Sequence, residues 1–523
     1  VADMCGIVGV LETAGATPEL ELLRRMAGEL EHRGPDGEGY LVDGAVGFGH
    51  KRLSIIDVAG SPQPMNSNDG RWCIVFNGEI VNYQDVRRSM SVEWATHGDT
   101  EVLLELVAAR GVGALAQVRG QFAFALLDRT DGSLLLARDR IGILPLFWTQ
   151  TDTRFAFASE VKALRPALEP LTVDTTSLHD YLAQRAVAAP FTLFEGIRKV
   201  MPGGWMKVHA DGRIEEGRYW SLDTPRPRLE LSPAEAVDEL ERLLTLAVEE
   251  SLVADVPVGA YLSGGVDSSI TVALAARATR AGHLNTFSAT FPGSPDDEGD
   301  YARRVSAKLG TVHHEVAVDP ADFWTELWRL AWYRDLPISQ TSDVAVAALA
   351  RLAAQHVTVV ISGEGSDELF GGYPKYRMAG LSRAAGLVPG IVRTPLLRAL
   401  RERGAKQNDR LGTALRALEG GDERDRLDGW FASYSEHELA RLCPTPGRGP
   451  GAVPHLHGDA VQRMGLVDLS SWLADNLLER GDRMTMASSI ELRPPFLDAR
   501  VVEFALTDPE VEAVLHGDLE VPL

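Results

Sequence analysis

Ser263-Gly264-Gly265-Val266-Asp267-Ser268-Ser269 is the stretch that decides the fold of the C-terminal half of this 523-residue chain. It follows the apolar run Val256 to Leu262 and precedes the helix-like run Ile270 to Ala278. A strand, a glycine turn and a helix start leave unpaired backbone N–H groups and the positive end of the helix facing one point, which suits a phosphate. The stretch therefore predicts a nucleotide-binding loop. The alternative is an ordinary glycine-rich turn between a strand and a helix.

The spacing of this loop differs from that of the common phosphate loop. It has no Gly-Lys-Ser/Thr end, so no lysine of the loop can reach the outer phosphates, and hydroxyl and amide groups must take that role. The pattern Ser-Gly-Gly-x-Asp-Ser resembles the pyrophosphate loop of enzymes that split ATP between its α and β phosphates. Those enzymes leave an adenylated substrate.

A second acidic loop repeats the arrangement about a hundred residues later. Ser362-Gly363-Glu364-Gly365-Ser366-Asp367-Glu368 follows the apolar run Val357 to Ile361. Two such strand-and-loop units place their loops at the same edge of a parallel sheet, where open α/β sheets bind ligands. Asp267 and Asp367 are then candidate ligands of Mg²⁺, which prefers a few carboxylates together with phosphate oxygens and water. A solvated acidic turn is the alternative.

The other end of the chain carries a separate candidate site at Cys5-Gly6-Ile7-Val8-Gly9. The chain has only 3 cysteines, which argues against a disulfide framework and for a reducing compartment. If Cys5 became the first residue, its own α-amine, with a reference pKa of about 7.7–8, could activate the thiol as a base. The alternative is a cysteine buried in a strand.

Further motifs between Cys5 and the nucleotide loop point to a family. With Cys5 they resemble the glutaminase domain of class II, N-terminal-nucleophile amidotransferases. With the two nucleotide loops behind them, nearly the whole chain resembles glutamine-hydrolysing asparagine synthetase. The motifs are, in order, His32-Arg33-Gly34-Pro35-Asp36, Arg52-Leu53-Ser54-Ile55-Ile56-Asp57, Asn77-Gly78-Glu79-Ile80-Val81-Asn82-Tyr83, Gly98-Asp99-Thr100-Glu101 and Arg138-Asp139-Arg140-Ile141-Gly142.

This resemblance implies a fold and a division into domains. We expect an α+β N-terminal αββα sandwich of the Ntn-hydrolase type, followed by an α/β parallel-sheet ATP-pyrophosphatase domain with extra helices. The expected glutaminase domain covers residues 5–208, the linker residues 209–233, and the synthetase domain residues 234–523. Ser232 and Pro233 are predicted to start the first helix of the second domain, as its N-cap and its first helical residue.

The resemblance also implies roles in the glutaminase half. The Cys5 thiolate would attack the glutamine side-chain amide, giving a glutamyl thioester and ammonia. Asn77 and the Gly78 N–H would form the oxyanion hole. Taken alone, Asn77-Gly78 is typical of a hairpin turn, and an arginine such as Arg52 could be a surface strand residue. The residues implied to hold glutamine are Arg52 at its α-carboxylate and Glu79 and Asp99 at its α-ammonium.

In the second half, the resemblance implies that ATP adenylates a carboxylate and that ammonia then forms an amide, releasing AMP and pyrophosphate. Glu364 is the candidate for taking the proton that ammonia loses. The implied ATP contacts are Ser263, Gly264, Gly265, Asp267 and Ser268 at the pyrophosphate, Leu262, Ser362 and Gly363 at the nucleoside, and Ala289. The expected cofactors are ATP and Mg²⁺, the latter on Asp267 and Asp367.

Two departures from the family bear on activity. Val1-Ala2-Asp3-Met4 precede Cys5, and a chain that keeps Met4 has no free α-amine on Cys5. Asn476 to Asp498 follow the family closely, but family members continue with a lysine-bearing segment, and Val511 to Leu523 contain no lysine. Either that segment is absent from this sequence or the synthetase site is incomplete, and we favour the former.

Composition fits an enzyme of two or three domains and adds exclusions. The net charge of −22 argues against binding nucleic acid through a basic face, and no apolar run reaches the roughly 18–20 residues of a membrane span. Cytoplasmic location is the default expectation. His313 and His314 would face opposite sides of a strand, and His455 and His457 have no cysteine partners nearby, so neither pair predicts a zinc site. By analogy a homodimer is expected.

The acyl acceptor stays open at this stage. Aspartate is the family default, and amidation of a different carboxylate in specialised metabolism is the main alternative. A non-catalytic scaffold on a decayed synthetase fold is a further alternative, which the intact nucleotide loop argues against. Ammonia is favoured as the nucleophile because Cys5, Arg52, Asn77 and Asp99 are all present.

Overall fold

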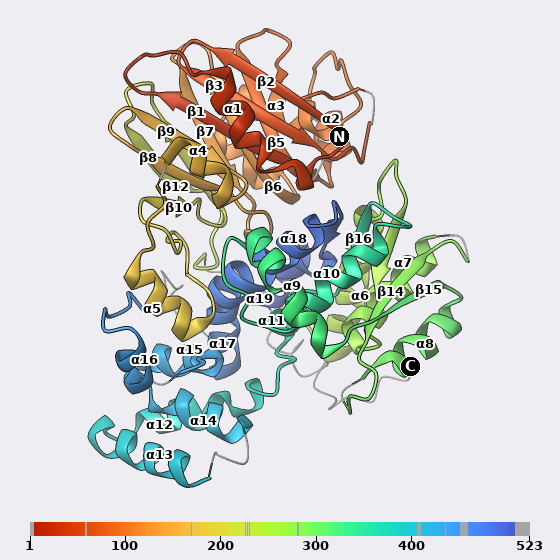
Figure 1. Ribbon diagram of the computed structural model, residues 1–523. Coiled ribbons are helices and arrows are strands. Elements are labelled where there is room, and N and C mark those ends of the chain that lie inside the picture. Colours follow the sequence, from red (N-terminus) through yellow and green to blue (C-terminus); the bar gives the residue numbers. More distant parts are fainter. Residues whose placement is uncertain are drawn as a thin grey trace.

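The computed structural model describes residues 5–507, apart from residues 58–59, 169, 225, 227–228, 230, 280–281, 296, 405–408, 435 and 450–458. Residues 1–4, Val511 to Leu523, His455 and His457, on which expectations were placed above, lie outside the described residues. Figure 1 shows the N-terminal half, in red to yellow, lying against the C-terminal half, in green to blue.

The N-terminal half contains two six-stranded sheets, each built from antiparallel pairs. The first has the order β10 (Ile197–Lys199), β8 (Phe147–Gln150), β9 (Arg154–Ala158), β1 (Gly6–Glu12), β3 (Val46–Arg52) and β2 (Gly37–Asp43). The second has the order β12 (Ile214–Arg218), β11 (Gly204–Val208), β7 (Ser133–Arg138), β6 (Gly120–Asp128), β5 (Trp72–Ile80) and β4 (Met65–Asn66).

Strand β1 illustrates why the sequence forms a sandwich. All its residues are buried, because alternate side chains point to opposite faces and both faces are covered. Ile7 and Leu11 pack in the core between the two sheets, whereas Val8 and Val10 pack beneath α1 (Leu20–Gly28). Helix α3 (Asp99–Arg110) covers the outer face of the second sheet. The four layers confirm the expected αββα arrangement. The remaining helices of this half are α2 (Tyr83–Arg88), α4 (Arg165–Leu168) and α5 (Thr175–Gln184).

The second sheet of the sandwich continues past Val208, where the sequence placed the end of the domain. Strand β12 pairs with β11 from Ile214 to Arg218, inside the range expected to be a linker. Its sequence is mostly polar and half exposed, as suits an edge strand, so it lacks the apolar alternation that would have revealed it.

The C-terminal half is built on a five-stranded parallel sheet, as expected for an α/β domain. Its order is β15 (Val312–Ala317), β14 (Asn285–Thr290), β13 (Val258–Tyr261), β16 (Val359–Ile361) and β17 (Glu491–Arg493). The helices up to β16 are α6 (Pro233–Ser251), α7 (Val266–Ala278), α8 (Gly299–Leu309), α9 (Pro320–Arg334) and α10 (Ser342–Ala353). Helix α6 begins as predicted: Glu235 N–H donates to the Ser232 hydroxyl, and Ser232 N–H donates to the Glu235 carboxylate.

Extra helices follow β16, and those formed by residues 379–468 lie at the lower left of Figure 1. They are α11 (Ser366–Phe370), α12 (Ala379–Gly386), α13 (Gly390–Gly404), α14 (Asp409–Glu419), α15 (Glu423–Asp428), α16 (Glu436–Leu442), α17 (Ala460–Asp468), α18 (Glu479–Met486) and α19 (Ala499–Thr507). A π-helix, Leu469–Leu478, joins α17 to α18. Among the described residues, no helix combines the length and apolar character needed to cross a bilayer.

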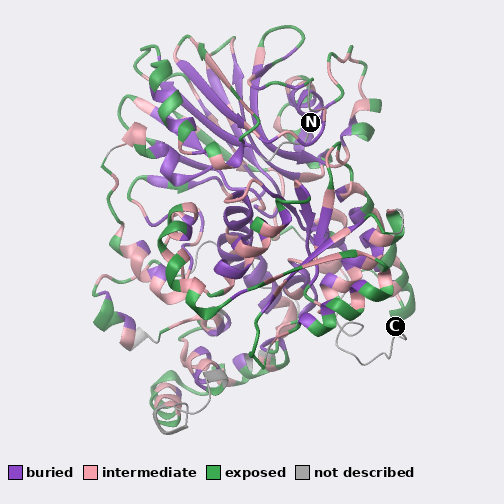
Figure 2. Cartoon of the chain, turned by 45° about the vertical axis from the view of Figure 1, so that its right-hand side comes forward, coloured by how far each residue is buried: buried purple, intermediate pink, exposed green. Residues whose placement is uncertain are grey.

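The two halves share a buried interface, visible in Figure 2 as continuous purple between the sandwich and the parallel sheet. Val359 of β16 and Met486 of α18 belong to the same apolar cluster as Ile55 and Val75 of the sandwich. Gln121 of β6 donates from Nε2 to the Leu492 carbonyl of β17 at 3.1 Å. The two halves therefore pack directly on each other.

Candidate active sites

The first site lies where β1 begins beside β5. Cys5 is fully buried, and its backbone N lies 2.7 Å from Asn77 Oδ1. A hydrogen bond to the amide oxygen of Asn77 leaves the Nδ2 end for another acceptor. Asn77 Nδ2 is buried and has no hydrogen-bond partner among the residues that the structure describes. A buried donor without an acceptor, beside a cysteine, suits an oxyanion.

Asn77-Gly78 is part of a strand rather than a hairpin turn. Both residues lie inside β5, where Asn77 pairs with Ala123 and Gly78 with Phe122 of β6. Gly78 has φ +143°, and a Cβ at this position would lie 2.2 Å from the Gln121 carbonyl oxygen. Glycine is therefore required by the close approach of the two strands. The structure overturns the hairpin alternative for this dipeptide.

The residues expected to hold glutamine lie near the same end of β5. Glu79 is on the same face of the strand as Asn77, since alternate residues share a face. Asp99, at the start of α3, accepts the Ile80 N–H at 2.8 Å. Burial raises the pKa of Asp99. Burial also raises the pKa of Glu79 well above its usual range, and the negative charges of Glu491 and Asp99 add to this shift. A bound ammonium would favour the ionised form of both carboxyl groups.

Two features of the residues expected to hold glutamine were not foreseen. The Glu79 carboxylate pairs at 2.8 Å with Nε of Arg493, a residue of the synthetase half. Arg52, at the end of β3, donates from Nη2 to the Asp57 carbonyl at 3.2 Å. Asp57 has φ +46°, an uncommon value for a residue other than glycine, so this loop is held in a specific conformation.

Arg33 is a buried residue that sequence reasoning quoted in a motif but gave no role. Its Nε donates to the Cys5 carbonyl at 3.1 Å, and its side chain is fully buried. The guanidinium is bound by Glu160 and Asp482. No pattern in the sequence reveals these partners, because they lie 127 and 449 residues away along the chain.

The second site lies at the C-terminal edge of the parallel sheet. Between β13 and α7, Ser263 N–H donates to the Ser268 hydroxyl at 3.2 Å, and Gly265 N–H donates to the Ser263 hydroxyl at 3.2 Å. Gly264 has φ +86°, and a Cβ there would lie 2.6 Å from the Ala302 backbone N. The loop is thus tightly folded against α8, with its serines and glycines at the start of α7.

The two nucleotide loops touch each other, as the parallel pairing of β13 with β16 requires. A Cβ at Gly363 would lie 3.1 Å both from Asp267 Cβ and from the Ser268 backbone N. Burial and the charge of Asp267 raise the pKa of Asp367 to about 6. The two carboxylates are therefore close and repel each other, an arrangement that a divalent cation would relieve.

The other residues predicted to contact ATP lie at the ends of the central strands. Leu262 is buried, and its N–H donates to the Phe287 carbonyl of β14 at 2.9 Å. Ala289 lies next to the last residue of β14, opposite Val316 of β15. Ser362 follows β16 directly and is buried. All three are therefore at the edge of the sheet that carries the two loops.

Glu364 is enclosed by the second loop and α18. Burial raises its pKa, and its Oε2 has no hydrogen-bond partner among the described residues. A Cβ at Gly481 would lie 3.0 Å from this oxygen, so the α18 backbone packs directly on the carboxyl group. The Tyr261 hydroxyl, which is also buried, likewise has no partner in the described part of the chain.

A polar cluster beside Glu364 was missed by sequence reasoning. Arg480 Nη1 donates to Gln340 Oε1 and to the Ser342 hydroxyl, both at 3.0 Å, and its Nε lies 3.9 Å from Asp343 Oδ1. Gln340 Nε2 and Asp343 Oδ1 are buried, and neither has a hydrogen-bond partner among the described residues. The one available signal was that Arg480 lies in the run Asn476 to Asp498 that matches the family.

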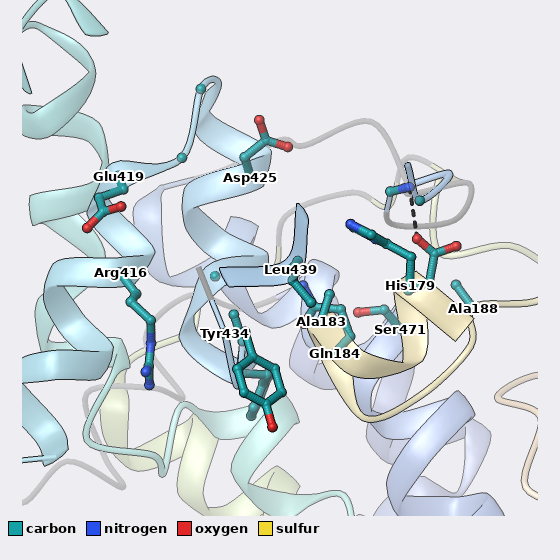
Figure 3. Close-up of a pocket in the computed structure, with 18 of the residues that line it drawn as sticks. His179, Ala183, Gln184, Ala188, Arg416, Glu419, Asp425, Tyr434, Leu439 and Ser471 are labelled. Atoms are coloured by element: carbon teal, nitrogen blue, oxygen red, sulfur yellow. Dashed lines mark hydrogen bonds between the residues drawn. The ribbon is translucent and has the colours of Figure 1, made fainter. Parts of the chain in front are cut away.

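Two other regions do not belong to these sites. His313 and His314 are engaged by neighbouring side chains of β14, and the described residues contain no cluster of three potential metal ligands of the His, Cys, Asp and Glu types. A cavity of about 580 Å³ is lined by residues of α5, the α13–α16 helices and the π-helix. Figure 3 shows part of its lining. None of the predicted site residues is among its described lining, which includes His179, Arg416, Tyr434 and Trp472.

Comparison with known proteins shows that the chain matches two families, one in each half. Residues 4–220 match the glutamine amidotransferase domain family, and residues 239–516 match the asparagine synthase family. The chain is 33% identical over 534 residues to "Asparagine synthetase [glutamine-hydrolyzing] 1" of Bacillus subtilis. This alignment covers 98% of this chain and 82% of that protein. The chain belongs to the asparagine synthetase family.

Other relatives carry related and different names. "Asparagine synthetase [glutamine-hydrolyzing] 3" of Bacillus subtilis is 30% identical over 544 residues, covering 99% of this chain and 83% of that protein. "Amidase chry2" of Gibberella zeae is 29% identical over 574 residues, and the alignment covers 97% of this chain and 83% of that protein. As in the asparagine synthetase family, the chain joins a glutamine amidotransferase to an ATP-dependent carbon–nitrogen ligase.

Proposed function

We propose that this chain converts aspartate to asparagine, using ammonia released from glutamine at Cys5 and ATP bound with Mg²⁺ at the two nucleotide loops. The observation that carries the choice of aspartate is the polar cluster of Arg480, Gln340 and Asp343 beside Glu364. An arginine with a neighbouring amide donor suits an α-carboxylate, and Asp343 suits an α-ammonium.

The size of the acceptor follows from how close these groups are. Arg480 immediately precedes Gly481, whose backbone packs on the Glu364 carboxyl group. The group that would bind the amino-acid end and the residue proposed to act at the acyl carbon are thus neighbours. The charge of Arg480 also acts on Glu364, so a short amino dicarboxylic acid is the acceptor that this proximity favours.

In the glutaminase half, the Cys5 thiolate adds to the side-chain carbonyl of glutamine. Asn77 Nδ2 and the Gly78 N–H stabilise the oxyanion, and expulsion of ammonia leaves a thioester that water cleaves to glutamate. Arg52, Glu79 and Asp99 hold the amino-acid end of glutamine.

In the synthetase half, the β-carboxylate of aspartate attacks the α-phosphorus of ATP and displaces pyrophosphate. Ammonia then adds to the acyl carbon, AMP leaves, and Glu364 accepts the proton that nitrogen loses. Asp267 and Asp367 would hold Mg²⁺, which supplies positive charge to the leaving pyrophosphate. The repulsion between these two carboxylates supports this assignment.

The test is release of pyrophosphate from ATP and Mg²⁺ with an ammonium salt across a panel of acids. The panel should contain aspartate, glutamate, succinate and β-alanine, and the protein should have Cys5 as its first residue and a verified C-terminus. Turnover with aspartate, with asparagine and AMP as products, supports the proposal. Turnover with succinate as fast as with aspartate would contradict the role of Asp343, and turnover only with another acid would assign the enzyme to a different amidation.

A further inference from the structure

The main chain of Cys5 is held at both ends by side chains. Asn77 binds its N, and Arg33 Nε binds its carbonyl oxygen at 3.1 Å. With both ends of the residue fixed, the direction of its Cα–Cβ bond is fixed, so the thiol is restricted to the few χ1 rotamers that this backbone allows. The geometry of the proposed nucleophile therefore depends on what holds Arg33.

Two carboxylates bind the Arg33 guanidinium, and they are not equivalent. Glu160 Oε1 lies 2.8 Å from Nη1, but Glu160 also pairs with His32, Lys162 and Arg483. Asp482 uses both oxygens for Arg33, with Oδ2 2.8 Å from Nη1 and Oδ1 2.8 Å from Nη2. A two-point contact fixes the plane of a guanidinium, which a shared single contact cannot do.

Asp482 belongs to the synthetase half, on helix α18. The helix residues before it face the other reaction centre: Arg480 is in the polar cluster, and Gly481 packs on Glu364. Asp482 is nearly fully buried, as are Arg33 and Glu160. In this enclosed environment the ion pair is shielded from water and holds its geometry.

We propose that Asp482 is a positioning residue of the glutaminase centre, which acts through Arg33 to fix the orientation of Cys5. The inference rests on the proposed role of Cys5 as nucleophile. It means that the C-terminal half supplies part of the geometry of the N-terminal reaction. Asp482 itself touches neither glutamine nor the reacting atoms.

The experiment compares full-length wild-type protein, with Cys5 as its first residue, with Asp482→Asn and Asp482→Glu. Glutamine hydrolysis is measured without ATP, so kcat and KM are obtained independently of the synthetase reaction. We expect Asp482→Asn to lower kcat about 10- to 100-fold with little change in KM, because small misplacements of a reacting group cost rates of this order. Asp482→Glu keeps the charge and should recover part of the loss.

Glu250→Gln is the matched control, because Glu250 pairs at 2.7 Å with Arg119 across the same interface but away from Cys5. It should leave glutaminase kcat unchanged. The proposal is overturned if Asp482→Asn keeps its kcat, if it changes only KM, or if Glu250→Gln loses kcat equally. If Asp482→Asn does not fold, Arg33→Lys takes its place, because it keeps the charge but loses the two-point contact with Asp482, and an unchanged kcat in that variant overturns the proposal.

Two measurements separate this proposal from the proposed function. Ammonia-dependent pyrophosphate release should persist in Asp482→Asn, which shows that the variant is folded. Wild-type protein should hydrolyse glutamine and Cys5→Ala should not. If Cys5→Ala hydrolyses glutamine as wild type does, the assignment of the nucleophile is wrong, and if neither protein does, the proposed glutaminase activity is wrong. Loss of hydrolysis in Asp482→Asn beside an active wild type supports the positioning role.

Discussion

Asn77 contributes both ends of one amide group to the proposed glutaminase centre. Its oxygen binds the Cys5 N, which orients the buried nitrogen end as a donor without a partner among the described residues. We expect Asn77→Ala to lower kcat for glutamine hydrolysis about 10²- to 10³-fold, since it removes one oxyanion donor. Ammonia-dependent synthesis is the internal control. Equal loss in both reactions would mean that the substitution disturbs the fold instead.

The backbone N of Cys5 gives a second prediction for single residues. A free α-amine can act as a base, but an amide nitrogen cannot. A chain that keeps Met4 should therefore lose glutamine-dependent turnover and retain ammonia-dependent turnover, compared with a chain that starts at Cys5. N-terminal sequencing of each preparation verifies the comparison. Robust glutaminase activity from a preparation that starts at Val1 would refute this prediction.

Glu364 should impose a pH dependence on the ammonia reaction. Burial raises its pKa, and only its ionised form can accept a proton. At a constant concentration of free ammonia, the rate should fall as the pH is lowered through this raised pKa. Glu364→Gln should lose about 10²- to 10⁴-fold in rate and should also lose this acidic limb. A Gln variant with the wild-type pH profile would exclude Glu364 as the base.

At the scale of elements, the glycines of the nucleotide loop determine its conformation. Gly264 has φ +86° and lies against α8, so a Cβ would be strained in its backbone and would clash with Ala302. Gly264→Ala should lower the free energy of unfolding by about 1–3 kcal/mol and raise KM for ATP. Gly265→Ala is the matched control, because Gly265 has φ −67° and no contact nearer than 3.3 Å. In urea, Gly264→Ala should unfold at a lower denaturant concentration than wild type, and Gly265→Ala should unfold close to wild type.

The same elements explain how far the sequence was predictive. The strand, loop and helix around Ser263 were predicted because local glycines and apolar runs determine them, and the cap at Ser232 for the same reason. Asn77-Gly78 has a local pattern typical of a turn, yet pairing with β6 places it inside a strand. The Arg480 cluster could not be predicted, since contacts between residues some 140 positions apart leave no local pattern.

At the scale of the whole molecule, the two halves are joined by charges that are almost completely removed from water. Lys199 of β10 lies 2.9 Å from Asp475 and 3.0 Å from Glu479 of the other half, and all three side chains are at most 5% exposed. Removing the lysine would leave two buried carboxylates short of a partner. We expect Lys199→Met to lower the free energy of unfolding by about 3–5 kcal/mol.

Lys207→Met is the matched control for this substitution, because Lys207 forms an exposed ion pair with Asp131 at 3.2 Å within the N-terminal half. Exposed pairs contribute about 0–1 kcal/mol, so this variant should unfold close to wild type in urea. Equal destabilisation by the two substitutions would show that burial of the Lys199 contacts does not matter.

The pH dependence of unfolding provides an independent test of the same contacts. Burial alone would raise the pKa of Glu479, but the charges of Lys199, Arg334 and Arg483 outweigh it and lower the pKa to about 2. In the unfolded chain the pKa is near 4.3, so acid protonates the unfolded state first. The stabilisation is therefore complete above about pH 5 and is lost as the pH falls towards 2. Lys199→Met should weaken this dependence, and an unchanged slope of unfolding free energy against pH would show that Lys199 does not hold Glu479 ionised.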